Sequence, residues 1–495
     1  MDGCAKCPPC AEGLENQENK AVCEYLGQSH CFGNKYAFVS GNMDRGKTLT
    51  QREILRLIYI KTNGNRWGDT YAKWSNIDID KCELPGVNCK NGLVTKLDLR
   101  NAELCTQGSE SMCMGIPTEI GLLGDSLEIL DLTKSFRWTN SFGIPTEIGM
   151  LTNLRYLHIS GNRLTGKIPS EIGRCTDLRV LNVSQCNISG PLPTTLGKLT
   201  KLEKINMVEN SFRGTLPTEI GLMTNLKEIL MSRSALEGSL PEELGMLGKL
   251  DNLELYGNAL VGSLPKSVAE LTRLRRIDLF NNKLSGTLDE LMRISALQIV
   301  HLRSNHFNGT IPNHIGSITG LSWIDASGNK LAGTIPASIS SLLDLRDFRM
   351  GDNYLEGPVP SDLCHSTQVN GGSKHEHSCD FILCPIDTYS QSGYAYSEQK
   401  AFSSEEILVP CHRCPQKETS LYLGSKFCRE LNQNDFVSMF YEAMDGDTWP
   451  PELRKMWNTP GTSVCDWAGV RCDTNGQVTG FDFPLSVFPF ESEIF

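Results

Sequence analysis

The stretch SGNMDRGKT, residues 40–48, has the residue types and spacing that bind nucleotide phosphates in other proteins. Gly41, Gly46, Lys47 and Thr48 match the pattern G-x-x-x-x-G-K-[ST], in which backbone amides and a lysine surround the phosphates. KYAFV before the stretch is predicted to be a strand, and LTQREILRLIYIKT after it a helix. Because this order of elements is the one the chemistry requires, nucleotide binding is the first hypothesis to weigh.

The cysteines are the second group with potential chemistry. The chain has 19 of them, and most lie in clusters near its two ends. CAKCPPC, HEHSC and the C-x-x-C pair at Cys411 and Cys414 contain metal-ligand residue types. A zinc ribbon, however, needs two matched pairs within one small domain, and these pairs lie at opposite ends of the sequence. We therefore favour disulfides and an oxidising compartment over zinc.

Catalytic signatures are missing from the sequence. G-x-S-x-G, H-E-x-x-H and the protein-kinase motifs do not occur, and the nine histidines are not tied by spacing to a nucleophile. We therefore predict no enzyme activity, no cofactor and no metal. The net charge of −11 argues against nucleic acid or an anionic membrane as the main partner.

The chain starts with MDGCAKCPPCAEG, without the charged and apolar regions of a secretory signal. It has no run of 18 or more apolar residues that would span a membrane. Since its cysteines indicate export, we expect it to be a fragment of a longer exported or cell-surface protein.

The middle of the chain is an internal repeat. The segment LTNLRYLHISGNRLTGKIPSEIG starts at Leu151, and its pattern recurs every 24 residues, with one step of 23. Two less regular units precede it, and their insertions hold Cys105, Cys113 and Trp138. We count about eleven units between residues 94 and 363. The position of Asn162 is filled in later units by Cys186, Asn210, Ser234, Asn258, Asn282, Asn305, Asn329 and Asn353.

Each repeat position has a physical role. Alternating leucines in L-x-L predict a short strand with one buried face, and parallel stacking of these strands predicts a solenoid with one continuous core. The Asn side chain can satisfy backbone groups inside the solenoid, where water does not reach. Cys186 is therefore predicted to be a core residue rather than a reactive thiol.

The pattern LxxLxLxxNxLxGxIPxxIG resembles the plant-type leucine-rich repeat of receptor-like kinase ectodomains, receptor-like proteins and polygalacturonase-inhibiting proteins. The resemblance covers residues 94–363. It implies an α/β leucine-rich repeat solenoid, right-handed, with a parallel β-sheet on its concave face and cysteine-bearing caps.

Two segments resemble the amino-terminal cap of such proteins. Residues 46–93 and 431–495 share tyrosine, glycine, tryptophan and cysteine positions, and both enter a strand through G-x-V-T. Residues 431–495 are therefore expected to hold a second cap and the start of a truncated second array. The resemblance implies a Cys82–Cys89 disulfide and a Cys465–Cys472 disulfide. The second copy has the same helix without a glycine loop or lysine before it. The helix after Lys47 therefore belongs to the cap, and we predict no nucleotide binding.

Residues 364–430 contain C-P-x-x-T-Y-S, C-x-x-C-P and G-S-x-x-C, which resemble a cysteine module of ephrin-receptor-like type. The resemblance implies that Cys384 pairs with Cys411, and Cys414 with Cys428. Residues 1–45 form a cysteine-rich segment that resembles the end of another such module.

Three sequons lie in the repeats, at Asn182, Asn187 and Asn308. Glycosylation fits an exported chain, although the repeat consensus can generate such triplets by itself.

The strand residues that flank each buried leucine face away from the core. Exposed aromatic residues beside arginine are typical of binding hot spots, although scattered exposed aromatics are also common. We predict a ligand surface in the later repeats, made of Tyr256, Asp278, Phe280, His301, Arg303, Trp323, Asp325 and Arg349.

The sequence thus favours a protein that acts by recognition rather than by catalysis. The first hypothesis is a receptor-type ectodomain segment that binds a peptide, protein or glycan. The alternatives are an inhibitor or modulator of a secreted carbohydrate-active enzyme and a structural extracellular matrix protein. The duplicated cap weighs against a single-array inhibitor.

Overall fold

The structure is a computed structural model, and it describes residues 49–76, 78–104, 115–136, 143–364 and 368–371, with Cys465 and short strands between 388 and 481. It divides into two compact units. The first runs to Asn308 and includes His314–Ile324 and Ser341–Asp344; the second has Gly309–Asn313, Asp325–Ser340 and the chain from Leu345 onward. Among the described residues, no helix has the length and apolar character needed to cross a membrane.

The first unit begins with helix α2, Gln51–Lys61. Thr50 and Glu53 form a reciprocal capping box at its start, which satisfies backbone amides that the helix leaves free. Its apolar face is buried beside Trp67 and Trp74. Short 3₁₀ helices follow at η1 (Gly64–Arg66), η2 (Asp69–Ser75) and η3 (Lys81–Glu83). These elements cover the end of the sheet that follows, as a solenoid requires.

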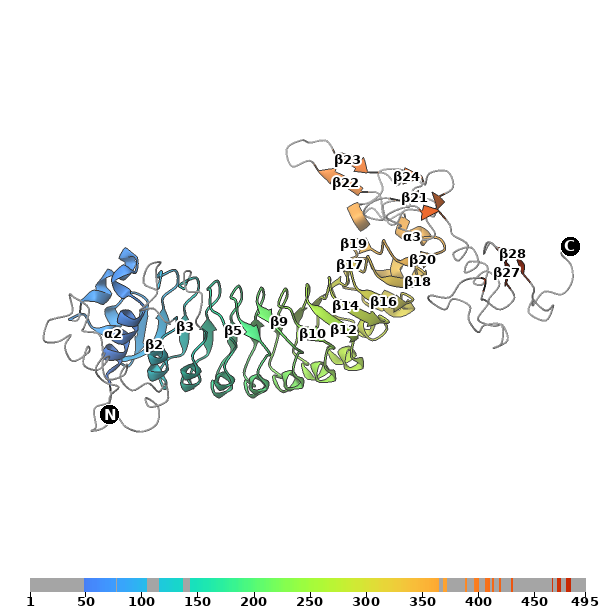
Figure 1. Cartoon of the computed structure of the whole chain (residues 1–495). Helices are drawn as coiled ribbons and strands as arrows, with labels where there is room; N and C mark the ends of the chain where they lie inside the picture. The colour runs from blue at the N-terminus through green and yellow to red at the C-terminus, as the bar shows by residue number, and fades with distance from the viewer. Residues whose placement is uncertain are drawn as a thin grey trace. The chain divides into compact units, whose positions relative to one another are not determined.

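Strands β1 (Val87–Lys90) and β2 (Leu93–Asp98) form an antiparallel pair, and β2 then starts a parallel sheet. Figure 1 shows these strands side by side in chain order, with α2 at the blue end. Successive side chains of a strand point to opposite faces, so the central residue of each three-residue strand points into the core and the two residues beside it point away. The further strands are β3 (Ile129–Asp131), β4 (Tyr156–His158), β5 (Val180–Asn182), β7 (Lys204–Asn206), β9 (Glu228–Leu230), β11 (Asn252–Glu254), β13 (Arg276–Asp278) and β15 (Ile299–His301).

The opposite side of the first unit consists of 3₁₀ turns, most of which start after the proline of an I-P or L-P pair. Consecutive turns approach closely. A Cβ atom on Gly149, for example, would lie 2.4 Å from the carbonyl oxygen of Glu171 in the next turn, so glycine is required there. The turns are η4 (Thr118–Leu123), η5 (Thr146–Met150), η6 (Ser170–Arg174), η7 (Thr194–Lys198), η8 (Thr218–Leu222), η9 (Glu242–Met246), η10 (Lys266–Glu270) and η11 (Leu291–Arg293).

A second set of parallel strands lies between the first sheet and these turns in the chain. It pairs β6 with β8, and it pairs β10, β12, β14 and β16 in that order. Their bounds are β6 (Ser189–Gly190), β8 (Ser211–Phe212), β10 (Glu237–Gly238), β12 (Ala259–Ser263), β14 (Lys283–Gly286) and β16 (His306–Gly309).

The predicted role of the repeat asparagine is confirmed. The side chain of Asn162 is buried and makes four hydrogen bonds to backbone groups. Its amide donates to the carbonyls of Leu132 and Ile159 at 2.9 and 2.6 Å, and its oxygen accepts from the amides of Ser135 and Phe136 at 2.8 and 2.7 Å. One side chain therefore joins two consecutive repeats at a position closed to water.

Cys186 occupies this position as a buried core residue, as predicted. Its thiol donates to the carbonyl oxygen of Ile159 at 3.3 Å, so it keeps one contact with the preceding repeat. Burial raises the pKa of Cys186 to about 11, which keeps the thiol protonated and unreactive at neutral pH.

In the second unit, β18 (Lys330–Thr334) pairs in parallel with β20 (Tyr354–Glu356). The side chain of Asn370 pairs with the backbone of Phe348 in β19 (Asp347–Arg349). Its oxygen accepts from the Phe348 amide and its nitrogen donates to the Phe348 carbonyl, both at 2.9 Å. Strand β17 (Trp323–Asp325) lies where the two units divide, and helix α3 covers Ser361–Cys364.

Short antiparallel pairs follow α3 in the chain. They are β21 (Thr388–Tyr389) with β24 (His412–Arg413), β22 (Tyr396–Gln399) with β23 (Glu406–Val409), β25 (Glu418–Thr419) with β26 (Arg429–Glu430), and β27 (Val470–Cys472) with β28 (Val478–Phe481).

The last of these pairs repeats the hairpin of the first cap. In the first hairpin Val87 pairs with Leu97, and in the second Val470 pairs with Phe481. Both hairpins have an irregularity in register just before a cysteine, Cys89 or Cys472. Disulfides join Cys82 to Cys89 and Cys465 to Cys472. The duplication seen in the sequence is thus also a duplication of backbone geometry.

Candidate ligand-binding face

The concave strand face of the first unit is the surface formed by the strand residues that point away from the core. The in-register pairing of parallel strands places equivalent residues of successive repeats beside one another. Asn252 pairs with Arg276, Glu254 with Asp278, and Asp278 with His301. Residues one repeat apart in sequence therefore become neighbours on one surface.

The aromatic residues predicted for this face contact one another. The rings of Tyr256 and Phe280 stack with centroids 4.4 Å apart and 8° between their planes, and the guanidinium of Arg233 lies 5.7 Å from the Tyr256 ring centroid. On the next two strands, β15 and β17, the rings of His301 and Trp323 form an edge-to-face contact with centroids 4.8 Å apart and 75° between their planes. The side chains of Tyr256, Phe280 and Trp323 are half-buried, because part of the surface of each packs against a neighbouring ring.

Asp278 is the centre of the polar contacts on this face. Its Oδ2 atom lies 2.8 Å from Nη2 of Arg276 and 3.2 Å from Nδ1 of His301. Nε of Arg276 lies 3.3 Å from Oε1 of Glu254. The side chain of Asp278 is only 2% exposed, so neighbouring side chains cover it.

The structure corrects the predicted exposure of two acidic residues. Asp278 and Asp325 were expected to be exposed on the strand face, but both side chains are buried. The Asp325 carboxylate accepts from the amide and hydroxyl of Ser327, at 3.0 and 2.6 Å, and so serves the local turn. Arg349 pairs with Asp347 at 2.9 Å, and Asp325, Asp347 and Arg349 belong to the second unit. Arg303 is exposed.

The repeat register also places Glu254 among the outward strand residues, but sequence reasoning left Arg233 and Arg276 out. Arg276 occupies the same alternating strand position as the predicted residues, so the repeat register was a signal that could have found it. Arg233 follows the strand, and its contact with Tyr256 depends on side-chain direction that the repeat pattern does not specify.

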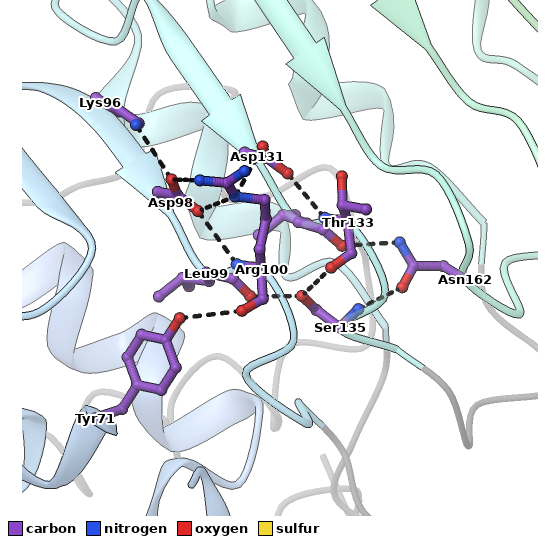
Figure 2. Close-up of polar contacts among 10 residues, drawn as sticks. Tyr71, Lys96, Asp98, Leu99, Arg100, Asp131, Thr133, Ser135 and Asn162 are labelled. Carbon is purple, nitrogen blue, oxygen red and sulfur yellow. Dashed lines mark hydrogen bonds and ion pairs between the residues drawn. The ribbon is translucent and has the colours of Figure 1, made fainter. Parts of the chain in front are cut away.

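A second polar cluster lies at the cap end of the same face (Figure 2). Arg100 makes a two-pronged contact with Asp98, at 2.9 and 2.8 Å, and its Nε atom lies 3.3 Å from Asp131. The Tyr71 hydroxyl donates to the Arg100 carbonyl at 3.2 Å, which links the cap to the first repeat. Burial alone would raise the pKa of Asp98, but hydrogen bonds from Arg100 and Lys96 outweigh it and hold this pKa below its ordinary value.

His158 lies beside Asp131 on the next strand. Burial lowers the pKa of His158, and the nearby carboxylate of Asp131 only partly opposes this effect. The cap-end cluster is internally paired, so it fits a structural role better than a ligand site.

The sequons differ in their surroundings. Asn182 is half-buried within strand β5, and its oxygen accepts from the amide and hydroxyl of Ser184 at 3.2 and 2.9 Å. Asn187 and Asn308 are exposed.

Several predicted residues lie outside the described part of the chain. They are Gly41, Gly46, Lys47 and Thr48 of the glycine-lysine stretch and Cys384, Cys411, Cys414 and Cys428 of the cysteine module. Within the described residues, no group of three or more His, Cys, Asp or Glu side chains is arranged to hold a metal ion.

The repeated strands, the 3₁₀ turns, the buried asparagine that recurs in successive repeats (the asparagine ladder) and the cap define a leucine-rich repeat solenoid. A model of the leucine-rich repeat region matches residues 123–237, and a model of the leucine-rich repeat N-terminal domain matches residues 439–473. The second match falls on the second copy of the cap. No curated protein matches the chain in sequence.

Solved structures give the same class. The ectodomain of the Arabidopsis thaliana receptor kinase GASSHO1/SCHENGEN3 is 29% identical, with a TM-score of 0.59, over 64% of this chain and 37% of that one. The ectodomain of the Arabidopsis receptor kinase HAESA is 30% identical, with a TM-score of 0.54, over 64% of this chain and 51% of that one. The chain thus spans about half or less of the ectodomains it matches. The fold is that of a leucine-rich repeat protein, and its structural likeness is to plant receptor kinase ectodomains.

Proposed function

We propose that this chain is a non-catalytic recognition module of an exported or cell-surface protein, and that it binds a peptide ligand on its concave strand face in receptor-like signalling. The observation that carries the proposal is the patch of contacting aromatic and charged side chains between Arg233 and Trp323. The fold does not need these side chains for its core, which the central strand residues already fill.

The related structures support a peptide over a protein or glycan ligand. GASSHO1/SCHENGEN3 is in complex with CASPARIAN STRIP INTEGRITY FACTOR 2, and HAESA is in complex with the peptide hormone IDA and the co-receptor SERK1. A row of in-register strands offers an extended peptide a surface along which successive repeats meet successive ligand residues.

The cysteines support an extracellular location. The Cys82–Cys89 and Cys465–Cys472 disulfides persist in oxidising compartments, whereas cytosolic thiols stay reduced. The second cap-like hairpin fits a protein with more than one repeat array, which argues against a single-array enzyme inhibitor.

The proposal can be tested with the full chain and a displayed library of random peptides. We expect Tyr256→Ala, Phe280→Ala and Trp323→Ala together to abolish retention of the selected peptides. The matched control replaces three exposed apolar residues away from the strands, Leu222, Met246 and Leu343, with alanine and should retain them. Circular dichroism checks that both variants fold. Equal retention by the two variants would overturn the proposal.

A further inference from the structure

We infer that the acidic pair Glu254 and Asp278 binds a cationic side chain, the ammonium of a lysine or the guanidinium of an arginine, within the peptide ligand. This inference rests on the proposed function and names the ligand chemistry that one part of the concave strand face selects.

The first observation is a local excess of negative charge. Glu254 and Asp278 are directly opposite each other on neighbouring strands β11 and β13. Like charges at directly opposed strand positions are destabilising, and a cation in contact with both offsets the repulsion. Arg276 contacts both carboxylates, at 3.3 and 2.8 Å, and it is the one cation that does so among the described residues. Two carboxylates thus share one guanidinium, so arginine supplies one formal positive charge against two formal negative charges.

The second observation is an unused hydrogen-bond acceptor. Arg276 and His301 both contact Oδ2 of Asp278, whereas the buried Oδ1 atom has no hydrogen-bond partner. A buried acceptor without a donor is costly, and a charged acceptor more so. Asn252 adds a second buried oxygen without a donor, since its amide nitrogen is turned to Glu254 at 2.9 Å. A ligand group with several N–H donors could donate a hydrogen bond to each of these two oxygen atoms.

The third observation is the route to this acceptor. The side chain of Glu254 is 21% exposed and that of Asp278 is 2% exposed. A ligand group would therefore meet Glu254 at the surface and Asp278 below it. A long, flexible side chain with a charged tip suits such a depth. Lysine and arginine have this shape, with apolar stems that pack on aromatic surfaces.

Aromatic rings frame the acidic pair. Tyr256 and Phe280 stack two residues after the ends of β11 and β13, and the His301–Trp323 contact joins the next two strands, β15 and β17. Cations are attracted to aromatic rings, more strongly where water is excluded. Arg303 is exposed and lies just after β15, where its positive charge would repel a ligand cation. The ligand cation is therefore favoured near β11, away from Arg303.

A metal ion is a poorer candidate for the same charge. Glu254, Asp278 and His301 are not arranged to hold a metal, and no other such group occurs in the described residues. The unused acceptors instead match the several hydrogen-bond donors of an ammonium or guanidinium group.

The test uses the full chain and an array of short random peptides that differ at one fixed position, occupied by lysine, arginine, norleucine or glutamate. We expect the lysine and arginine sets to be retained about tenfold more strongly than the norleucine set, as a charge-assisted hydrogen bond predicts. Asp278→Asn should remove this preference, and Glu254→Gln should reduce it. The matched control is Asp131→Asn, which changes an acidic residue that also pairs across strands with a histidine, and it should keep the preference.

The outcomes separate this inference from the proposed function. If peptides bind through Tyr256, Phe280 and Trp323 but show no preference for lysine or arginine, the inference is wrong and the proposed function stands. A preference that persists in both Asp278→Asn and Glu254→Gln would also overturn the inference. If no peptide set is retained, or if retention survives the triple alanine variant, both the proposed function and the inference fail.

Discussion

The rings of Tyr256 and Phe280 lie parallel, 4.4 Å apart, although one full repeat separates the two residues in sequence. The contact exists because β11 and β13 pair in register, which brings equivalent positions of neighbouring repeats together. The same rule brings Glu254 beside Asp278. A surface with stacked rings next to paired charges is therefore a direct product of repeat length.

The asparagine ladder predicts unequal costs of truncation. Asn162→Ala would remove four buried hydrogen bonds to backbone groups, and we expect it to lower the free energy of unfolding by about 3 kcal/mol or more. Cys186→Ala removes only weak thiol contacts and should cost clearly less. Urea denaturation of both variants measures the difference. Equal losses would show that the amide contacts do not decide the stability of the repeat.

The cap-end cluster predicts acid sensitivity. Burial lowers the folded-state pKa of His158, so the unfolded state binds more protons, and stability should fall as pH drops below the unfolded value of about 6.5. The depressed pKa of Asp98 acts at lower pH: its contribution is present above about pH 4 and is lost as pH falls through the folded value. Urea midpoints between pH 8 and 3 for the parent chain and His158→Gln measure both. In His158→Gln, the fall in the urea midpoint that starts below about pH 6.5 should disappear, while the fall at lower pH remains. A profile identical to that of the parent chain would contradict the assignment to His158.

The Cys82–Cys89 disulfide closes a short loop beside β1. Replacing both cysteines with serine should lower the free energy of unfolding by about 2–3 kcal/mol, because the unfolded cap gains freedom. The loss should disappear when parent and variant are compared under reducing conditions. A variant as stable as the oxidised parent would mean that the cap does not depend on this bond.

The sequons should differ in use. We expect glycans on the exposed Asn187 and Asn308, and little on Asn182, whose side chain is engaged within the sheet. Glycopeptide mass spectrometry of the secreted chain measures the occupancy of each site. High occupancy at Asn182 would place a glycan on the concave strand face and would argue against that face as the ligand surface.

The glycine-lysine stretch should not bind nucleotide. Helix α2 begins at Gln51, after Thr48, and Thr50 caps it, so the lysine and threonine of the pattern precede the helix. We expect ATP with magnesium to leave the melting temperature unchanged. A stabilising shift that Lys47→Ala removes would overturn this prediction.

The sequence was sufficient for the solenoid, because the L-x-L alternation and the recurring asparagine fix which side chains are buried. It also identified the duplicated cap from the cysteine and tryptophan spacing. It did not show that Asp278 is buried, since strand alternation alone assigns that residue to the open face. The side chains of Arg276 and His301 contact the Asp278 carboxylate, and such side-chain directions vary within a fixed backbone pattern.

The amide of Asn370 completes both backbone hydrogen bonds of Phe348, as a neighbouring strand would. An added strand, whether from another molecule or from an aggregate, would have to displace a partner that is already bound. This single side chain thus occupies the backbone groups of Phe348 that an added strand would need, and so protects the edge of the sheet at β19.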